Sequence, residues 1–394
     1  MKMKKLLSLV LTAAMTATVL VGCGGSDSSS DSVVTTSAGG SAVFKIGGIG
    51  PTTGSAAVYG TAVMNGAQIA VDEINAAGGI NGMQIELNFQ DDECDAEKSV
   101  NAYNTLTDWG MQALVGTTTS GCCLAVAPEA ADDNVFLLTP SGSAVECIAY
   151  DNAFRVCFSD PNQGIASAQY IGQNSIATKV AVIYDSSDVY SSGIYEKFAA
   201  EAPNQGIEIV AAEAFTADSK TDFSVQIQKA KDAGAELVFL PIYYTEASLI
   251  LAQADQAGFE PIFFGCDGLD GILGVENFDT ALAEDVMLLT PFAADADDEL
   301  TKKFVSAYNE KYGETPNQFA ADSYDAVYVI KAAAEKAGIT AGMSPSDVCD
   351  ALVPVMTEIT VDGLTGEGMT WSADGEPSKA PKAVKIKNGV YTAM

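Results

Sequence analysis

Short apolar runs alternate with amphipathic segments along most of this chain, and this alternation constrains the fold more than any other feature. Residues 44–49 form a short apolar run, residues 60–77 place apolar side chains at helical spacing, and residues 84–89 alternate between apolar and polar side chains. The pattern is that of a strand, a helix and a strand. Strands that alternate with helices pair in parallel and are covered on both faces, so the sequence predicts an α/β fold.

The alternation breaks once, at residues 140–151, and then resumes. Before the break we also expect helices at 96–109 and 122–133 and strands at 113–115 and 135–138. After it we expect helices at 162–173, 191–202, 222–233 and 245–257, strands at 180–184, 208–212, 237–240, 262–264 and 286–289, helices at 298–312, 319–337 and 345–353, and terminal strands at Trp371 and 383–386. Roughly 350 folded residues exceed what one core usually supports, so two doubly wound lobes are predicted.

The N-terminus has the pattern of an export signal. Lys2, Lys4 and Lys5 precede the apolar residues 6–20, a stretch that suits a signal peptide and is short for a spanning helix. Leu20-Val21-Gly22-Cys23 resembles the lipobox of bacterial lipoproteins, which implies cleavage before Cys23 and a lipid on Cys23. Residues 24–41 are mostly Ser, Gly, Asp and Thr and predict a flexible tether. The alternative is an ordinary membrane anchor with an incidental cysteine.

Composition argues against several classes of function. The net charge of −32 argues against nucleic-acid binding through a basic surface, and the absence of histidine excludes Ser/His/Asp or Cys/His catalysis and histidine-ligated metals. Gly48, Gly50 and Gly54 have the wrong spacing for a dinucleotide loop, and Pro51 removes a backbone donor there. We therefore expect neither an enzyme nor a bound metal or cofactor.

The chain has eight cysteines, and seven remain when Cys23 is set aside. Disulfides are permitted outside the cytoplasm. Our candidate pairs are Cys94 with either Cys122 or Cys123, and Cys147 with Cys157. Buried, reduced thiols are the alternative.

A series of motifs, in order, carries a resemblance to a known family. The motifs are Gly50-Pro51-Thr52-Thr53-Gly54, Tyr59-Gly60, Asn65-Gly66-Ala67, residues 74–82, residues 91–95, Thr139-Pro140-Ser141, Arg155 with Asp160, Gln163-Gly164, Tyr243-Tyr244, and Gly265 with Asp267-Gly268. Together they resemble the substrate-binding lipoproteins of ABC importers, of the leucine/isoleucine/valine-binding type. The resemblance covers essentially all of the chain after Ser41.

The resemblance implies the type I periplasmic binding protein fold, with two doubly wound parallel-sheet lobes joined by three hinge segments and a ligand cleft between them. After the signal peptide (1–22) and the lipidated tether (23–41), one lobe comprises 42–159 and 291–378. The other lobe comprises 160–290 and 379–394.

The resemblance also implies the ligand contacts. Ser120, Ser141 and Ser143 would take the carboxylate of an amino acid or share its ammonium group. Asp267, where the family more often has Glu, would pair with the ammonium, and Asp160 would close on the same side. Tyr59, Tyr190, Tyr243 and Tyr324 would surround the ligand side chain, and we expect Arg155 to be structural.

The serine and threonines at positions 118–120 suit such a site. Ser120 is expected at a helix start, where free N–H groups attract an anion. Thr118 and Thr119 replace an apolar residue and a Cys of well-known members. This more polar wall favours alanine, serine, threonine or an amide over leucine.

These features predict an extracytoplasmic protein, anchored through Cys23, that captures an L-amino acid by hinge closure and presents it to an ABC permease. We expect a monomer without a nucleic-acid partner. The alternatives are a ligand-sensing module of a signalling system, and a member of the same family that binds an amide- or urea-like solute.

Overall fold

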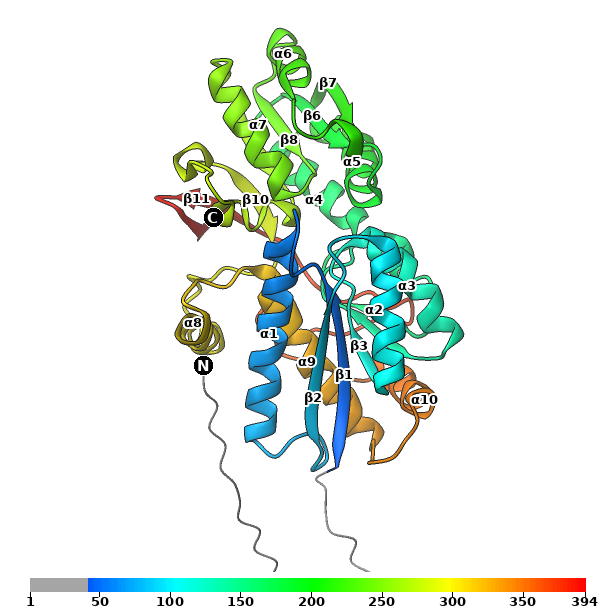
Figure 1. The fold of residues 1–394 in the computed structure, drawn as a ribbon. Helices are drawn as coiled ribbons and strands as arrows, with labels where there is room; N and C mark the ends of the chain where they lie inside the picture. The colour runs from blue at the N-terminus through cyan, green and yellow to red at the C-terminus, as the bar shows by residue number, and fades with distance from the viewer. Residues whose placement is uncertain (1–41) are drawn as a thin grey trace, which may run out of the picture. The chain divides into compact units, whose positions relative to one another are not determined.

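The computed structural model describes residues 42–394 (Figure 1). The predicted signal peptide, Cys23 and the whole tether (24–41) lie outside the described residues. Within the described residues, no helix combines the length and the apolarity needed to cross a bilayer.

The first sheet is entirely parallel, with the strand order β2-β1-β3-β4-β5. Its strands are β1 (Val43–Gly50), β2 (Gln84–Asp91), β3 (Ala113–Val115), β4 (Phe136–Thr139) and β5 (Ala153–Arg155). Every residue of β3, β4 and β5 is buried, as expected for parallel strands that are covered on both faces. The covering helices are α1 (Ala57–Ala76), α2 (Ala96–Trp109) and α3 (Ser120–Asp132), with a 3-10 turn η1 at Val145–Ile148.

Three helices from late in the chain also pack with the first sheet and its covering helices. They are α8 (Glu299–Tyr312), α9 (Gln318–Ala337) and α10 (Pro345–Met356). The longest, α9, packs along α1, where the Ser323 hydroxyl donates to the Val63 carbonyl at 2.8 Å (Figure 1).

The second sheet has the order β12-β11-β10-β9-β8-β6-β7. Its strands are β6 (Lys179–Asp185), β7 (Glu208–Phe215), β8 (Leu237–Leu240), β9 (Ile262–Gly265), β10 (Met287–Thr290), β11 (Lys382–Lys387) and β12 (Val390–Ala393). β6 to β10 are parallel, whereas β11 and β12 are antiparallel. Its helices are α4 (Asp160–Gln173), α5 (Val189–Glu201), α6 (Ser224–Asp232) and α7 (Tyr244–Gln256), with 3-10 turns η2 (Ala202–Gln205), η3 (Ala217–Ser219), η4 (Asp267–Leu269), η5 (Ile272–Gly274) and η6 (Thr280–Ala283).

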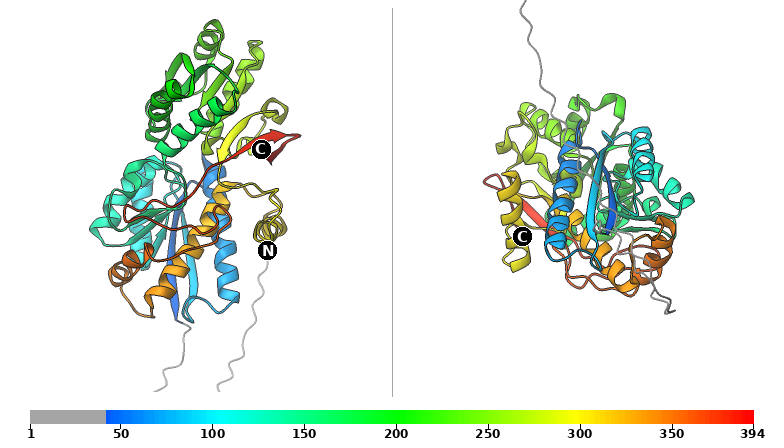
Figure 2. Two further views of the ribbon diagram at one scale, coloured as in Figure 1. Left: turned by 180° about the vertical axis from the view of Figure 1, so that it is seen from behind. Right: turned by 60° about the horizontal axis from the view of Figure 1, so that its bottom comes forward.

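The chain passes between the two sheet systems three times: after β5, after β10 and before β11. The last passage leads into β11 and is visible from behind in Figure 2. Two expectations need correction. Trp371 forms only an isolated bridge with Pro377, and the break at 140–151 is followed by an unpredicted strand, β5.

Candidate functional site

A small cavity lies where the carboxyl ends of strands from both sheets meet. Its lining includes most of the predicted ligand contacts, and it adds residues that were not predicted as contacts. The lining residues are Tyr59, Thr118, Thr119, Ser120, Ser141, Tyr190, Tyr243, Asp267, Gly268 and Phe319. Ser143 and Asp160 lie directly behind this lining and contact it or each other, whereas Tyr324 lies elsewhere.

Asp267 is the buried acidic centre of the site. It begins η4 just after β9, and 5% of it is exposed. The Tyr190 hydroxyl donates to Oδ1 at 2.6 Å, and the Gln163 amide donates to Oδ2 at 3.0 Å. The Gln318 amide donates to the Asp267 main-chain carbonyl at 2.9 Å. The carboxyl group is therefore fixed in position by neutral donors.

Burial raises the pKa of Asp267 to about 6, although the hydrogen bonds from Tyr190, Gln163 and Gly268 partly oppose this shift. No lysine or arginine is among the described residues that line the cavity. A carboxylate that is buried without a cation is costly, and a positively charged ligand group would offset that cost.

Asp160 supplies a second buried carboxyl group beside the first. It begins α4, and its N–H donates to the Ser143 carbonyl at 2.9 Å. Among residues 42–394, Oδ1 of Asp160 has no hydrogen-bond partner. Burial raises its pKa well above the usual value, and the nearby Asp267 raises it further, while a hydrogen bond from Ser143 opposes the shift.

Aromatic rings form one wall of the cavity. Tyr190 stacks on Tyr243 with centroids 5.1 Å apart, and Tyr59 meets Tyr243 edge-on at 5.5 Å. Phe319 packs on Tyr59 at 4.4 Å. Sequence reasoning missed Phe319 because a single phenylalanine at a helix start has the same pattern as a core residue.

The tyrosine hydroxyls also join the two sheet systems. The Tyr59 hydroxyl, from α1, donates to the Gly268 carbonyl and accepts from the Tyr244 N–H at 3.2 Å. The Gly268 N–H donates to the Tyr190 hydroxyl at 2.9 Å. The rings are thus held in one arrangement by polar contacts as well as by packing.

Serines form the opposite wall. Ser120 is the first residue of α3, and its hydroxyl accepts from the N–H groups of Ser143 and Ala144 at 3.1 and 3.2 Å. The Ser141 hydroxyl donates to the Thr118 carbonyl at 2.6 Å. The first N–H groups of a helix have no partner within the helix, so this wall favours an anion.

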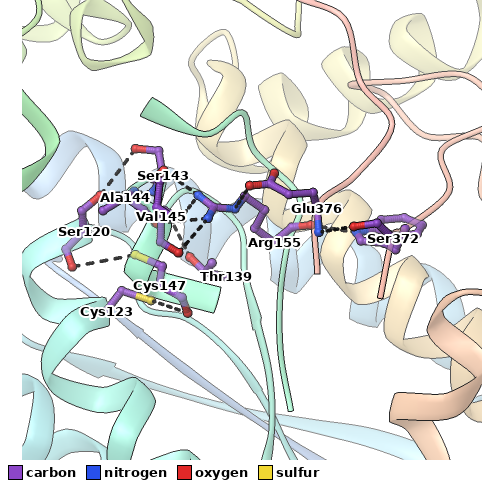
Figure 3. Close-up of polar contacts among 12 residues, drawn as sticks. Ser120, Cys123, Thr139, Ser143, Ala144, Val145, Cys147, Arg155, Ser372 and Glu376 are labelled. Carbon is purple, nitrogen blue, oxygen red and sulfur yellow. Dashed lines mark hydrogen bonds and ion pairs between the residues drawn. The ribbon is translucent and has the colours of Figure 1, made fainter. Parts of the chain in front are cut away.

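Arg155 holds the serine wall from behind (Figure 3). It is fully buried, and its guanidinium donates to the main-chain carbonyls of Gly142, Ser143, Ala144 and Val145. Its Nε lies 3.5 Å from Glu376, which is within ion-pair range but lacks hydrogen-bond geometry. The expectation that Arg155 is structural agrees with these contacts.

Tyr324 is not part of the site. Its hydroxyl donates to Glu73 on α1 at 2.8 Å, and its ring packs on Phe304, with the centroids 4.9 Å apart. Tyr324 follows Phe319 by five residues, which is roughly 140° around a helix. Because Phe319 lines the cavity, Tyr324 faces α1 and α8 instead.

The predicted disulfides are also absent, because all seven cysteines of the described region are free thiols. Cys147 lies on η1 against α3, where the Cys123 thiol donates to its carbonyl at 3.9 Å. Cys94 does lie beside Cys122, whose hydrogen bond lowers the pKa of Cys94. The neighbouring thiols are therefore Cys94 with Cys122 and Cys123 with Cys147.

The cavity is narrow but continues outward. Its free volume is about 10 Å³, close to the minimum that holds one water molecule. A second chamber of about 250 Å³ shares Thr119 and Tyr243 with it and includes Cys94, Asp188 and Glu246 in its lining. An amino acid would fill the inner cavity only after the lobes or the rings separate.

Comparisons with known proteins agree with this architecture. A family model described as periplasmic binding protein matches residues 43–390. The leucine-, isoleucine-, valine-, threonine- and alanine-binding protein of Pseudomonas aeruginosa is 33% identical over 315 residues, which cover 78% of this chain and 82% of that protein. Leu/Ile/Val-binding protein homolog 3 of Brucella melitensis biotype 1 is 34% identical over 303 residues, or 75% and 79% of the two chains.

A solved structure extends the comparison to three dimensions. LivJ of Streptococcus pneumoniae, a branched-chain amino acid transporter substrate-binding protein in complex with isoleucine, is 31% identical with a TM-score of 0.80. The match covers 89% of this chain and all of that one. The fold class and the family resemblance are confirmed: this chain belongs to the periplasmic binding protein family, within the group of Leu/Ile/Val-binding proteins.

Proposed function

We propose that this protein captures a free L-amino acid between its two lobes and presents it to the permease of an ABC importer. The observation that carries the proposal is the buried carboxyl group of Asp267, which has only neutral donors around it. Across the cavity, Ser120 begins α3 and offers the anion-binding end of that helix. Such a site matches the ammonium and the carboxylate of one amino acid.

The ligand side chain is proposed to be small or branched and neutral. The wall combines aromatic rings with Thr118 and Thr119, and no basic side chain is present among these lining residues to pair with an acidic ligand. The Pseudomonas aeruginosa relative is named for binding leucine, isoleucine, valine, threonine and alanine. We place alanine, serine and threonine first because the two threonines make this wall partly polar.

The proposed lobes are those expected from the sequence, and the three chain passages between the sheet systems serve as hinges. Family members are solute-binding proteins that act outside the cytoplasm. For this chain we further propose a monomer that is anchored through a lipid on Cys23. Replacing Cys23 by Ala should release the protein from membranes; retention on the membrane would argue against the anchor.

A thermal-shift screen against the common amino acids, followed by titration calorimetry, tests the assignment. At least one neutral amino acid should bind with a micromolar Kd, which corresponds to about −8 kcal/mol. Asp267→Ala should weaken binding at least 100-fold, whereas Asp297→Ala, whose side chain is 99% exposed, should have no effect. Binding of urea or short amides without any amino acid would reject the ligand class but not the family.

A further inference from the structure

A large cavity lies apart from the ligand cavity. It has a volume of about 710 Å³ and lies among the first turns of α1, the η4–η5 region, α8 and the β12 hairpin. Val58, Leu273, Val305 and Val390 give it an apolar lining. None of its lining residues belongs to the lining of the inner ligand cavity.

A buried acidic residue borders this apolar space. Asp270 lines the cavity and is 4% exposed. Its Oδ2 accepts from the Gln318 N–H at 2.8 Å, whereas Oδ1 has no hydrogen-bond partner among the described residues. The Tyr391 hydroxyl lies near this carboxyl group and accepts from the Gly271 N–H at 3.0 Å.

The charged side chains that line the cavity are all acidic. Asp295 and Glu314 also line it, and no lysine or arginine does so in the part of the chain that the structure describes. Burial raises the pKa of Asp270 to about 7, and the Gln318 N–H and the Tyr391 hydroxyl reverse this only in part. A buried carboxyl group without a cation favours a positively charged partner.

We propose that this cavity is a second binding site, for a small organic monocation with an apolar body, of the alkylammonium class. The ammonium group pairs with the carboxylate of Asp270, and the alkyl part packs against Val58, Leu273 and Val305. The rings of Tyr308 and Tyr391 supply further faces that attract a cation. The large volume and the apolar lining suit an alkyl chain better than a bare metal ion, and no group of metal-ligating side chains occurs among the described residues.

The site is distinct from the amino-acid site, yet it is physically connected to it. The same residue, Gln318, donates its N–H to Asp270 and its side-chain amide to the Asp267 carbonyl. Because an amine could also bind at Asp267, the test must remove that carboxylate. It is therefore made in an Asp267→Ala background, in which the outcome does not depend on the proposed amino-acid function.

Butylammonium is the probe, and its affinity is measured by ligand-observed NMR titration. It should bind saturably with a millimolar Kd, and neutral butan-1-ol should bind at least tenfold more weakly. Asp270→Asn should weaken butylammonium binding at least tenfold, and Val305→Trp, which fills the cavity from the partly exposed face of α8, should abolish it. Asp297→Asn, a loss of charge at an exposed position outside the cavity, should leave the Kd unchanged.

Two results would overturn the proposal. One is the absence of saturable butylammonium binding. The other is an equal Kd in the background protein and in the Val305→Trp variant, which remains informative even if Asp270→Asn does not fold.

Discussion

The hydroxyl of Tyr190 donates a 2.6 Å hydrogen bond to Oδ1 of Asp267, and both residues are buried. The same hydroxyl accepts from the N–H of Gly268, the residue that follows Asp267. One phenol therefore fixes both the carboxyl group and the adjacent main chain. This arrangement keeps the acidic centre in position before any ligand arrives, which lowers the cost of ordering it upon binding.

Tyr190→Phe should weaken amino-acid binding by about tenfold, since a hydrogen bond to a charged group contributes about 1.5–3 kcal/mol. The variant also leaves the Gly268 N–H without its partner. Calorimetry on the purified variant measures the effect. Tyr195→Phe is the control, because Tyr195 stacks on Tyr184 with centroids 4.1 Å apart outside the site. Equal affinities for Tyr190→Phe and wild type would show that the hydrogen bond does not matter for binding.

Amino-acid affinity should fall as the solution becomes acidic. Burial raises the pKa of Asp267 to about 6 in the ligand-free protein. The ligand ammonium requires the ionised form, whose fraction decreases as pH falls through that value. The apparent Kd should therefore rise by about tenfold between pH 7 and pH 5. The raised pKa of Asp160 acts in the same direction.

Titration calorimetry across this pH range measures the dependence. In Asp267→Asn, affinity should be low throughout and the step near pH 6 should disappear. An unchanged step in that variant would assign the titration to another group, with Asp160 the first candidate.

The fold was largely predictable because parallel strands leave a strong local signal. β8 reads Leu-Val-Phe-Leu and is fully buried, so its apolar run directly reflects cover on both faces. β5 escaped prediction because Arg155 interrupts its apolar run, whereas the equally short β3 is apolar throughout. Trp371 was misassigned because an apolar residue buried in a chain passage has the same pattern as a residue in a strand.

The site was predictable only in part. Ser120 and Asp267 follow buried strands, and their polarity is conspicuous there. Gln163 and Gln318 orient Asp267 from distant helices, and a lone glutamine gives no sequence signal for such a contact. Tyr324 was predicted as a ligand contact but lies outside the cavity. An aromatic residue at a matching sequence position does not specify which face of α9 it occupies.

Ser120→Ala should reduce both stability and affinity. Its hydroxyl accepts from two buried N–H groups, those of Ser143 and Ala144. Each donor that is left unsatisfied costs about 1–3 kcal/mol of stability. Urea unfolding gives the stability change and calorimetry gives the affinity. Ser306→Ala, at an exposed position of α8, is the matched control, and equal behaviour of the two variants would contradict the structural role of Ser120.

Arg155→Met should destabilise the protein by about 3–5 kcal/mol, the range for breaking a buried charged contact. The guanidinium satisfies carbonyls of residues 142–145, whereas its ion pair with Glu376 is longer and partly exposed. Glu376→Gln should therefore cost less than about 1 kcal/mol. Urea unfolding of both variants compares the two contributions. Similar losses would mean that the ion pair, and not the carbonyl contacts, dominates.

Mild oxidation should link Cys94 to Cys122 before any other pair. Cys94 is half-buried, and a hydrogen bond from Cys122 lowers the pKa of Cys94, so it combines access to the oxidant with an environment that favours the reactive thiolate. With diamide as oxidant, thiol titration should show a fast loss of two thiols. Cys123 and Cys147 should react more slowly because both are fully buried.

Cys122→Ser should remove the fast phase, whereas Cys123→Ser should retain it. Mass mapping of a non-reduced digest identifies the linked peptides. A fast phase that persists in Cys122→Ser, or a Cys147–Cys157 link, would contradict the pairing, because Cys147 packs on α3 beside Cys123.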